Sequence, residues 1–456
     1  MKNGSRESEI VKWRFLKWRF NTRTFAIVVC ILCLYAVVFA WLFAKNLTSD
    51  TDYPTHMHNI WALSHGYWIK DPFINGGNSF TLAYGAPAIV FGTLLYPLLD
   101  VFTVAALLAL AFPVLWYYSK RVFEGLASKK IAELATFAVL LNPLTVYMFL
   151  TAKLPFIWAT CFGLMSVAFY LRGRGLLAAV MGVLAVITHP VAIFLFGALF
   201  LINLDLRQWL KLYIPAATVF IIQLFAIFQL SVGGGVVPVF YTTIILLAAA
   251  LTALSLTRME SRIPCTVALA VLVGLVIACF LGVSIPTVYF DRIAWFVFVL
   301  SLPFLIKRVT PSLLKKLIPA ATIFTLVFSS ALICVHAVSV FDNPSVYQEL
   351  PSGITQELEN KYVRYATDGS ALYELPQLNI RFSNAGNEAF ERQIFVEYID
   401  NAEAYRMHLE MENASYILVY GQTPEENFIN QLGYALIYSV DNLKIYKTDV
   451  APSHLT

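Results

Sequence analysis

The sequence predicts an all-α, polytopic membrane domain of about eleven transmembrane helices, followed by a small soluble α/β domain. Hydrophobic residues make up 59% of the chain and charged residues only 13%, about half the charged share of an ordinary soluble protein. The apolar residues occur in runs of roughly 20, the length with which a helix crosses a bilayer while satisfying its own backbone. Beyond about residue 341 the composition becomes polar and mixed, which predicts the second domain.

The first predicted span covers residues 25–44 and follows a basic leader. It is longer than the apolar region of a cleavable signal peptide, so we expect it to remain as a membrane anchor. The other ten predicted spans are residues 102–118, 132–150, 155–171, 175–188, 190–204, 212–230, 238–256, 264–282, 293–306 and 317–338.

The distribution of Lys and Arg predicts the orientation of these spans. With a cytoplasmic N-terminus, the even-numbered connections are expected to be cytoplasmic and basic. They contain Lys120, Arg121, Lys129, Lys130, Arg172, Arg174, Arg207, Lys211, Arg258, Arg262, Lys307, Arg308, Lys315 and Lys316. The opposite connections contain only Lys45, Lys70, Lys153 and Arg292. We therefore expect a multi-pass plasma-membrane protein with its N-terminus in the cytoplasm and its C-terminal domain on the other side.

The charge pattern also excludes a further span at residues 84–99, because that span would place the basic residues 120–130 outside. The segment carries Pro87, Gly92 and Pro97, and we expect it to lie at the outer membrane face as a juxtamembrane or re-entrant segment. Residues 1–338 are thus predicted to form the transmembrane domain, with an outer loop at 45–101 that holds juxtamembrane helices. Residues 339–456 are predicted to form the extracytoplasmic α/β domain.

Within that C-terminal domain, residues 414–421 are expected to form a buried strand. A helix should follow, with Pro424 in its first turn and Gly433 as its C-terminal cap. Residues 434–440 and 443–448 then read as a β-hairpin, and an earlier helix is expected over residues 387–412.

The outer loop opens with two carboxylates and two imidazoles, Asp50, Asp52, His56 and His58. A helix is expected to begin at Pro54, and it would place His56 and His58 on different faces, so a zinc site made of all four residues is not expected. One alternative is that Asp50 and Asp52 hold a hard cation such as Mg²⁺ or Mn²⁺. The other is that these are solvated loop residues that cap a helix.

Several short motifs follow one another along the chain. They are Asp52-Tyr-Pro-Thr-His56, Gly76-Gly77, Tyr84-Gly85-Ala86-Pro87, Leu95-Tyr96-Pro97-Leu98, Leu141-Asn142-Pro143, Lys153-Leu-Pro-Phe156, Thr188-His189-Pro190 and Asp291-Arg292. In order and predicted topology they resemble the GT-C superfamily of membrane glycosyltransferases, especially a prokaryotic multi-pass group often labelled 6-pyruvoyl-tetrahydropterin-synthase-related. One departure is the single Pro97 where that group often has two prolines.

The resemblance implies a GT-C-like enzyme that uses a polyprenyl-phosphate-linked sugar on the outer membrane face, in cell-envelope glycan or glycolipid assembly. The residues fit such chemistry independently. Asp52, together with His56, is the catalytic candidate, because sugar transfer needs a carboxylate to deprotonate or orient the acceptor. Lys153 and Arg292 are candidates for neutralising the departing phosphate, with interfacial anchoring as their alternative role. His189 is a further candidate for contacting the phosphate or the acceptor.

Two other classes of protein remain open: a transporter or flippase of a lipid-linked substrate, and a non-catalytic membrane scaffold on the same fold. A transporter usually carries internal repeats, broken helices and charged residues near the bilayer midplane. The predicted spans have almost no charges at that depth, which favours chemistry at the membrane surface. The expected partners are the lipid bilayer, the polyprenyl-phosphate-linked sugar and a glycan, lipid or protein acceptor, and no nucleic acid.

Overall fold

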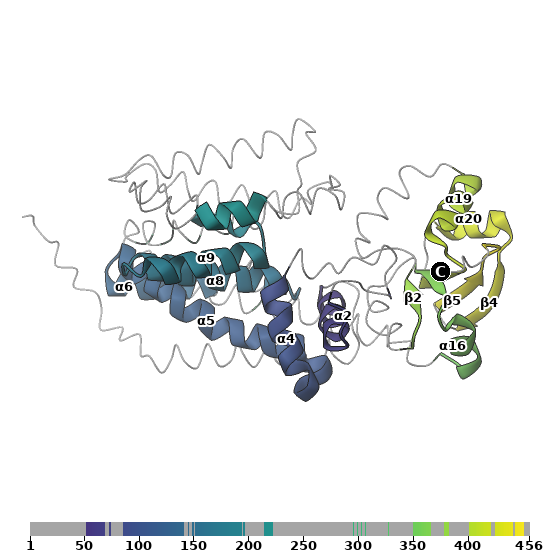
Figure 1. The fold of residues 1–456 in the computed structure, drawn as a ribbon, viewed down its shortest axis with the longest axis horizontal. Coiled ribbons are helices and arrows are strands. Elements are labelled where there is room, and N and C mark those ends of the chain that lie inside the picture. The colour runs from purple at the N-terminus through teal and green to yellow at the C-terminus, as the bar shows by residue number, and fades with distance from the viewer. Residues whose placement is uncertain are drawn as a thin grey trace, which may run out of the picture.

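A computed structural model of the 456-residue chain shows a group of helices and a separate α/β module (Figure 1). The structure describes residues 52–68, 73, 85–140, 145, 148–149, 151–193, 195–196, 214–221, 295, 299, 302, 306, 327, 350–365, 378–382, 401–420, 425–440 and 443–450. The predicted spans at 25–44, 238–256 and 264–282 lie outside the described residues, as does the predicted domain boundary at 338–339.

The helical part contains six numbered α-helices and one 3₁₀ turn among the described residues, and residues 214–221 are also helical. The numbered elements are α2 (Tyr53–Ser64), α4 (Ala86–Leu99), η1 (Asp100–Phe102), α5 (Thr103–Leu126), α6 (Lys129–Leu140), α8 (Leu154–Tyr170) and α9 (Gly175–Thr188). Helices α8 and α9 match two predicted spans to within one residue. Helix α5 continues eight residues beyond the predicted end at residue 118, and this extension carries Lys120 and Arg121.

Within the described residues, the stretch Ala86–Leu126 is both long and apolar enough to cross a membrane. It joins α4, η1 and α5, with the left-handed Asp100 (φ 45°) at the break between the two helices. Helix α4 has 14 residues, a length of about 21 Å, which is short for a full crossing. Its Leu94 and Leu98 are exposed. The total of eleven spans stays a prediction.

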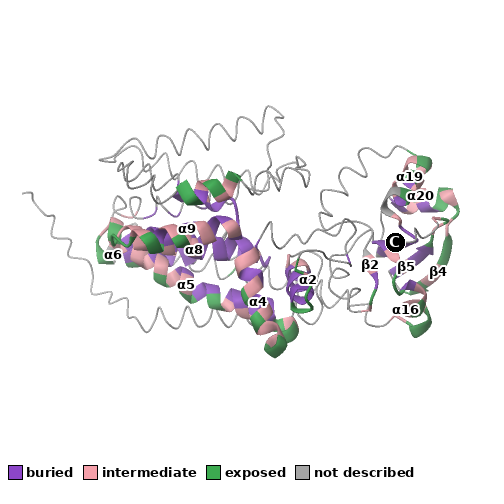
Figure 2. Cartoon of the chain, viewed as in Figure 1, coloured by how far each residue is buried: buried purple, intermediate pink, exposed green. Residues whose placement is uncertain are grey.

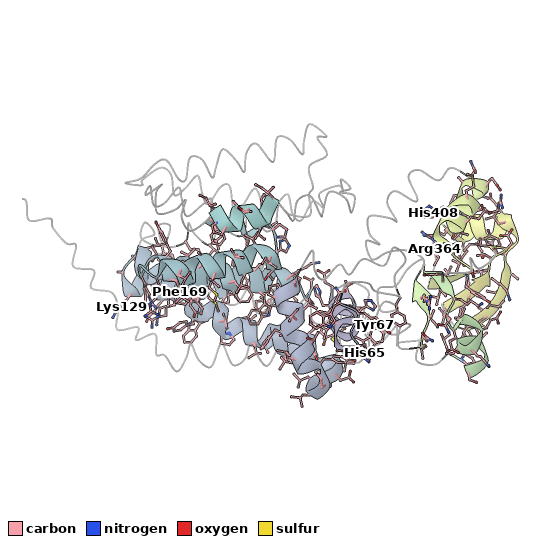
Figure 3. All side chains as sticks on the ribbon, viewed as in Figure 1. His65, Tyr67, Lys129, Phe169, Arg364 and His408 are labelled. Carbon is pink, nitrogen blue, oxygen red and sulfur yellow. The ribbon has the colours of Figure 1, made fainter. Side chains whose placement is uncertain are left out.

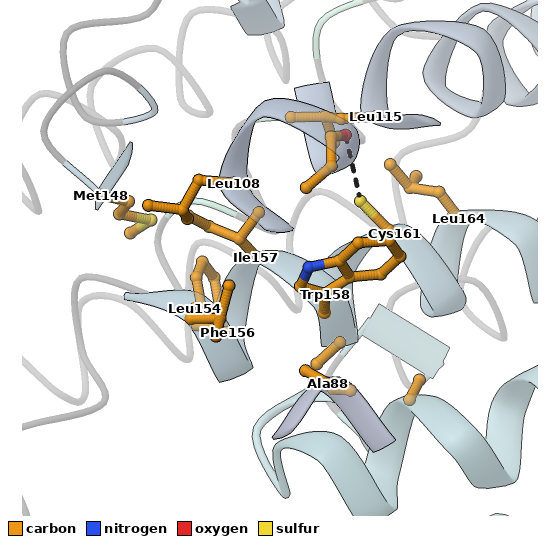
Figure 4. Close-up of a cluster of buried hydrophobic side chains, with 14 of the residues drawn as sticks. Ala88, Leu108, Leu115, Met148, Leu154, Phe156, Ile157, Trp158, Cys161 and Leu164 are labelled. Carbon is orange, nitrogen blue, oxygen red and sulfur yellow. Dashed lines mark hydrogen bonds between the residues drawn. The ribbon is translucent and has the colours of Figure 1, made fainter. Parts of the chain in front are cut away.

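The helices pack closely where small residues face a neighbouring helix, and their buried sides face one another (Figure 2). A Cβ on Gly163 of α8 would lie 2.6 Å from a Leu195 methyl carbon, so only glycine permits that approach. Three residues further along α8, the Ser166 hydroxyl donates to the carbonyl of Ala178 in α9 at 2.6 Å. Figure 4 shows the apolar cluster between α5 and α8, in which the Cys161 thiol donates to the Ala111 carbonyl at 3.5 Å.

The C-terminal module is a five-stranded sheet in the order β2-β1-β3-β5-β4. Its elements are α16 (Ser352–Leu358), β1 (Tyr362–Tyr365), β2 (Arg381–Phe382), α19 (Ala402–Glu412), β3 (Tyr416–Tyr420), α20 (Glu425–Leu432), β4 (Ala435–Val440) and β5 (Leu443–Lys447). Strand β1 runs parallel to β2 and β3, whereas β5 is antiparallel to β3 and β4. Two apolar clusters, one on each face of the sheet, form the core.

The local predictions for this module are largely confirmed: the buried strand, the hairpin, and the helix that ends at Gly433 (φ 68°) are present. The expectation of one helix over residues 387–412 is wrong in its start. Asn401 has an extended backbone, and its side chain accepts a hydrogen bond from the Ala404 N–H at 2.9 Å, so α19 begins only at Ala402. An N-cap residue has non-helical backbone, so a single helix cannot run through Asn401; residues 387–400 lie outside the described residues. Strands β1 and β2 and helix α16 were not predicted.

Candidate functional site

Two predicted site residues, Asp52 and Lys153, meet in the structure. The Lys153 ammonium donates to Asp52 Oδ1 at 2.7 Å, although the residues are 101 positions apart. Asp52 directly precedes α2 and Lys153 directly precedes α8. A second link, from the Asp52 N–H to the Thr151 carbonyl at 3.2 Å, joins the same two helix starts. Both side chains remain partly exposed, 36% for Asp52 and 24% for Lys153, so a ligand can reach them.

The position of Lys153 depends on a tight turn before α8. Ala152 adopts the left-handed region with φ 53°, which costs roughly 1–2 kcal/mol for a residue with a Cβ. The Lys153 N–H donates to the Met148 carbonyl at 2.9 Å and closes the turn. Pro155 then occupies the first turn of α8, where its missing N–H is tolerated. The chain therefore stores strain immediately beside the cation.

His189 lies at the end of α9 and is fully buried. Its Nδ1 accepts a hydrogen bond from the Val191 N–H at 3.2 Å, so the neutral ring carries its proton on Nε2. The ring packs edge-to-face against Phe156 in the first turn of α8, with 5.7 Å between centroids. The structure thus brings His189 to the same helix start as Lys153.

Gly85 adds the start of α4 to the three helix ends already described, the starts of α2 and α8 and the end of α9. Its N–H donates to the Thr188 carbonyl at 3.0 Å, which ties the start of α4 to the end of α9. Gly85 has φ 83°, and a Cβ there would lie 3.1 Å from Pro155 Cγ. We refer to the region where the starts of α2, α4 and α8 meet the end of α9 as the Asp52 end of the helices. The sequence indicates Gly85 only as part of the motif Tyr84-Gly85-Ala86-Pro87 and predicts no role for it in the site.

Tyr53 anchors α2 at this end. Its hydroxyl donates to the Val101 carbonyl in η1. Burial raises the pKa of the Tyr53 phenol well above its usual value, so the group stays protonated and keeps this bond. The bond holds the first turn of α2, and with it Asp52, against the start of α5.

The structure corrects the interpretation of the outer-loop histidines as solvated residues. His56 and His58 are 4% and 2% exposed, because α2 is buried along almost its whole length. The His56 N–H donates to the Asp52 carbonyl at 3.0 Å, so His56 follows Asp52 by one helical turn. The Asp52 carboxylate contacts Lys153 rather than capping α2, which corrects the capping interpretation as well.

Metal binding at this end receives no support from the described residues. Among them, no group of three or more His, Cys, Asp or Glu side chains could hold an ion. Of the two predicted ligands, Asp50 lies outside the described residues, and the carboxylate of Asp52 is already neutralised by Lys153. The residues that are described therefore do not fit a resident Mg²⁺ or Mn²⁺ ion, which prefers unshared carboxylate oxygens.

Arg292 lies outside the described residues, but Trp295, three positions further on, is described. The Trp295 indole N–H donates to the Thr145 hydroxyl at 2.8 Å, and its ring packs edge-to-face against Phe156 at 5.9 Å. Trp295 is thus a neighbour of the first turn of α8, where its ring contacts the same Phe156 as His189 does.

By its fold, the chain resembles polytopic helical membrane proteins. The structure of ArnT from Cupriavidus metallidurans, crystallised with bound undecaprenyl phosphate, matches with a TM-score of 0.56 over 93% of this chain and 98% of that chain. The sequence identity is 14%, so the similarity concerns the fold alone. No protein-family model and no curated protein sequence matches the chain.

Proposed function

We propose that this chain is a membrane glycosyltransferase that moves a sugar from a polyprenyl-phosphate carrier to an acceptor at the extracytoplasmic face. The observation that carries the proposal is the contact between Asp52 and Lys153, which joins a carboxylate and a cation at one partly exposed place. The match to the fold of ArnT, whose crystal structure holds undecaprenyl phosphate, supports a function that involves a polyprenyl phosphate. The placement in cell-envelope glycan or glycolipid assembly is part of the proposal.

The proposed reaction is a displacement at the anomeric carbon of the donor sugar. The acceptor oxygen forms a bond to that carbon while its proton passes to the Asp52 carboxylate. The bond between the carbon and the phosphate oxygen breaks, and its electron pair stays on the departing polyprenyl phosphate. The Lys153 ammonium neutralises the charge that develops on that oxygen.

The other predicted residues support these two groups in the proposal. His189, which lies at the same helix start as Lys153 and accepts from the Val191 N–H at its Nδ1, is the further candidate for contacting the phosphate or the acceptor. His56, one helical turn after Asp52, is the second catalytic candidate. Arg292 is proposed as a second cation for the phosphate.

A transporter or flippase is the alternative, and burial argues against it. Among the described residues of the helical part, the buried polar side chains belong to Ser, Thr, Asn and His, with no Lys, Arg, Asp or Glu. Translocation pathways usually place Lys, Arg, Asp or Glu deep between helices, often together with His; of these residue types, only His is buried among the described residues of the helical part. The described charges at the Asp52 end are instead partly exposed.

The test measures transfer from a polyprenyl-phosphate-linked sugar in membranes that contain the full chain. Asp52→Asn is expected to lower the rate about 100-fold or more, since it removes the proton acceptor. Glu133→Gln is the matched control, because it removes a partly exposed ion pair to Lys120 (3.4 Å) between α5 and α6. An Asp52→Asn variant at full rate would show that Asp52 is not the base. A wild-type chain that transfers no polyprenyl-linked sugar would favour the scaffold.

A further inference from the structure

We infer that Asp52 also acts as an internal competitor for the lipid phosphate, so that donor binding itself makes the base available. In the protein without donor, Lys153 is held by Asp52; when the donor arrives, its phosphate takes Lys153 from the carboxylate. The inference rests on the proposed function and concerns the regulation of the same site.

The geometry of the pair supports the competition. A single ammonium, Lys153 Nζ, lies 2.7 Å from Asp52 Oδ1, and the proposed reaction needs that ammonium at a phosphate oxygen. A carboxylate oxygen and a phosphate oxygen are both anionic acceptors for the same donor. Asp52 therefore holds one of the three N–H donors of the Lys153 ammonium, and the two anions compete for the charge and the direction of that side chain.

Lysine suits such an exchange. Its ammonium is a compact point charge on a flexible four-carbon stem, unlike the planar guanidinium of arginine. The backbone of Lys153 is held by its hydrogen bond to Met148 and by the start of α8, while its side chain is 24% exposed. The cation can move from one anion to another by side-chain rotation, and the helix ends stay in place.

The strained turn at Ala152 is a second, independent observation at the same place. Left-handed backbone at a residue with a Cβ (φ 53°) persists only where the surroundings hold it. Such outliers concentrate at ligand clamps and switches. Here the strained residue immediately precedes the cation and follows Thr151, whose carbonyl accepts from the Asp52 N–H. The turn thus sets the distance between the carboxylate and the cation.

The exchange has a consequence for the order of the reaction. A carboxylate that is held by an ammonium accepts a proton less readily than one that is not. In this inference Asp52 becomes a stronger base once a phosphate has engaged Lys153. The acceptor is therefore deprotonated more readily when a donor is present.

The experiment measures binding of undecaprenyl phosphate to the purified full chain in nanodiscs, with undecaprenol and inorganic phosphate as separate ligands. Asp52→Asn is expected to bind undecaprenyl phosphate about three- to tenfold more tightly than wild type, because it removes both the competing partner and a like charge. Lys153→Met is expected to bind about tenfold more weakly. Glu133→Gln, which releases Lys120 instead, should bind like wild type.

The outcomes separate the inference from the proposed function. If Asp52→Asn binds no more tightly than wild type, while Lys153→Met still weakens binding, the competition is wrong and the phosphate site stands. If wild type binds undecaprenol as well as undecaprenyl phosphate, the proposed function itself fails. Inorganic phosphate that binds wild type as tightly as the lipid would overturn a lipid-specific site. Should Asp52→Asn fail to elute as a folded protein, Asp52→Ser provides the same comparison.

Discussion

Lys153 and Asp52 are joined at 2.7 Å across 101 residues of sequence, and each directly precedes a helix. The contact makes the start of α8 and the start of α2 one structural unit. Changes to the cation, to the turn that carries it, or to the packing of α2 are therefore expected to have related effects on activity.

Removal of the cation is expected to be costly for transfer. Lys153→Met should lower the transfer rate in membranes about 100-fold, because the departing phosphate loses a charge partner in the transition state. Lys153→Arg should restore part of the rate, since it keeps the charge with a different geometry. Lys120→Met, at the far part of α5, is the control and should transfer like wild type. An unchanged rate in Lys153→Met would contradict a role at the phosphate.

The turn at Ala152 predicts opposite effects of two small substitutions. Ala152→Gly removes the Cβ that disfavours φ 53° and should leave thermal stability unchanged or raise it. Ala152→Val places a β-branched side chain at a left-handed, 2% exposed position and should lower the melting temperature and the transfer rate together. Thermal unfolding in detergent measures the melting temperature of each variant, and the transfer assay in membranes measures its rate. Equal melting temperatures for the two variants would refute the strain at this residue.

Gly92 controls the approach of α4 to α2. A Cβ at residue 92 would lie 2.7 Å from Ile60 Cδ1 and 3.2 Å from a Leu107 methyl carbon. Gly92→Val should therefore destabilise the chain by about 1–3 kcal/mol and reduce transfer, because α2 carries Asp52. The added substitution Ile60→Ala makes room and should recover part of the loss in a double-mutant cycle. Additive effects of the two substitutions would show that the helices do not meet there.

The C-terminal module contains a buried ion pair that is expected to dominate its stability. Arg364 of β1, labelled in Figure 3, donates to both oxygens of Glu425 at 3.3 Å, and the Tyr405 hydroxyl donates to Glu425 Oε2 at 2.9 Å. Glu425→Ala should cost about 3–5 kcal/mol, because it leaves a buried guanidinium without its carboxylate. Hydrogen–deuterium exchange of β1 and β3 in the full chain measures the loss. Glu403→Gln, at the exposed pair with Arg406, is the control, and equal exchange in both variants would contradict the prediction.

A surface pair in the same module predicts a weak dependence on acid. The hydrogen bond from Lys447 lowers the pKa of Glu357 below its usual value. A lowered folded-state pKa contributes stability that is present above the usual pKa of a glutamate and is lost as the pH falls through the folded value. The pair is exposed, so the effect should be small and should shrink with salt. Unfolding of wild type and Glu357→Gln is compared at neutral and acidic pH, and a larger difference at acidic pH would reverse the assigned sign.

Local features of the sequence predicted local structure well. The apolar run of α8 begins at Pro155 and ends at the turn Arg172-Gly173-Arg174. The apolar run of α9 begins after that turn and ends before Pro190. The C-terminal hairpin and the Gly433 cap follow from turn chemistry that acts within a few residues. The start of α19 differs from the predicted one because Asn401 is its N-cap, with an extended backbone.

The sequence by itself determined which residues carry charge beside the helix ends, and it predicted Asp52 and Lys153 as separate candidates with separate tasks. Only the tertiary structure decided that they are partners, that Ala152 is strained between them, and that His56 and His189 are buried. The physical reason is the distance along the chain over which each interaction acts. Helix ends and caps depend on neighbours a few residues away, whereas the contact between Asp52 and Lys153 exists only because the packing of α2, α4, α8 and α9 brings four distant chain segments to one place.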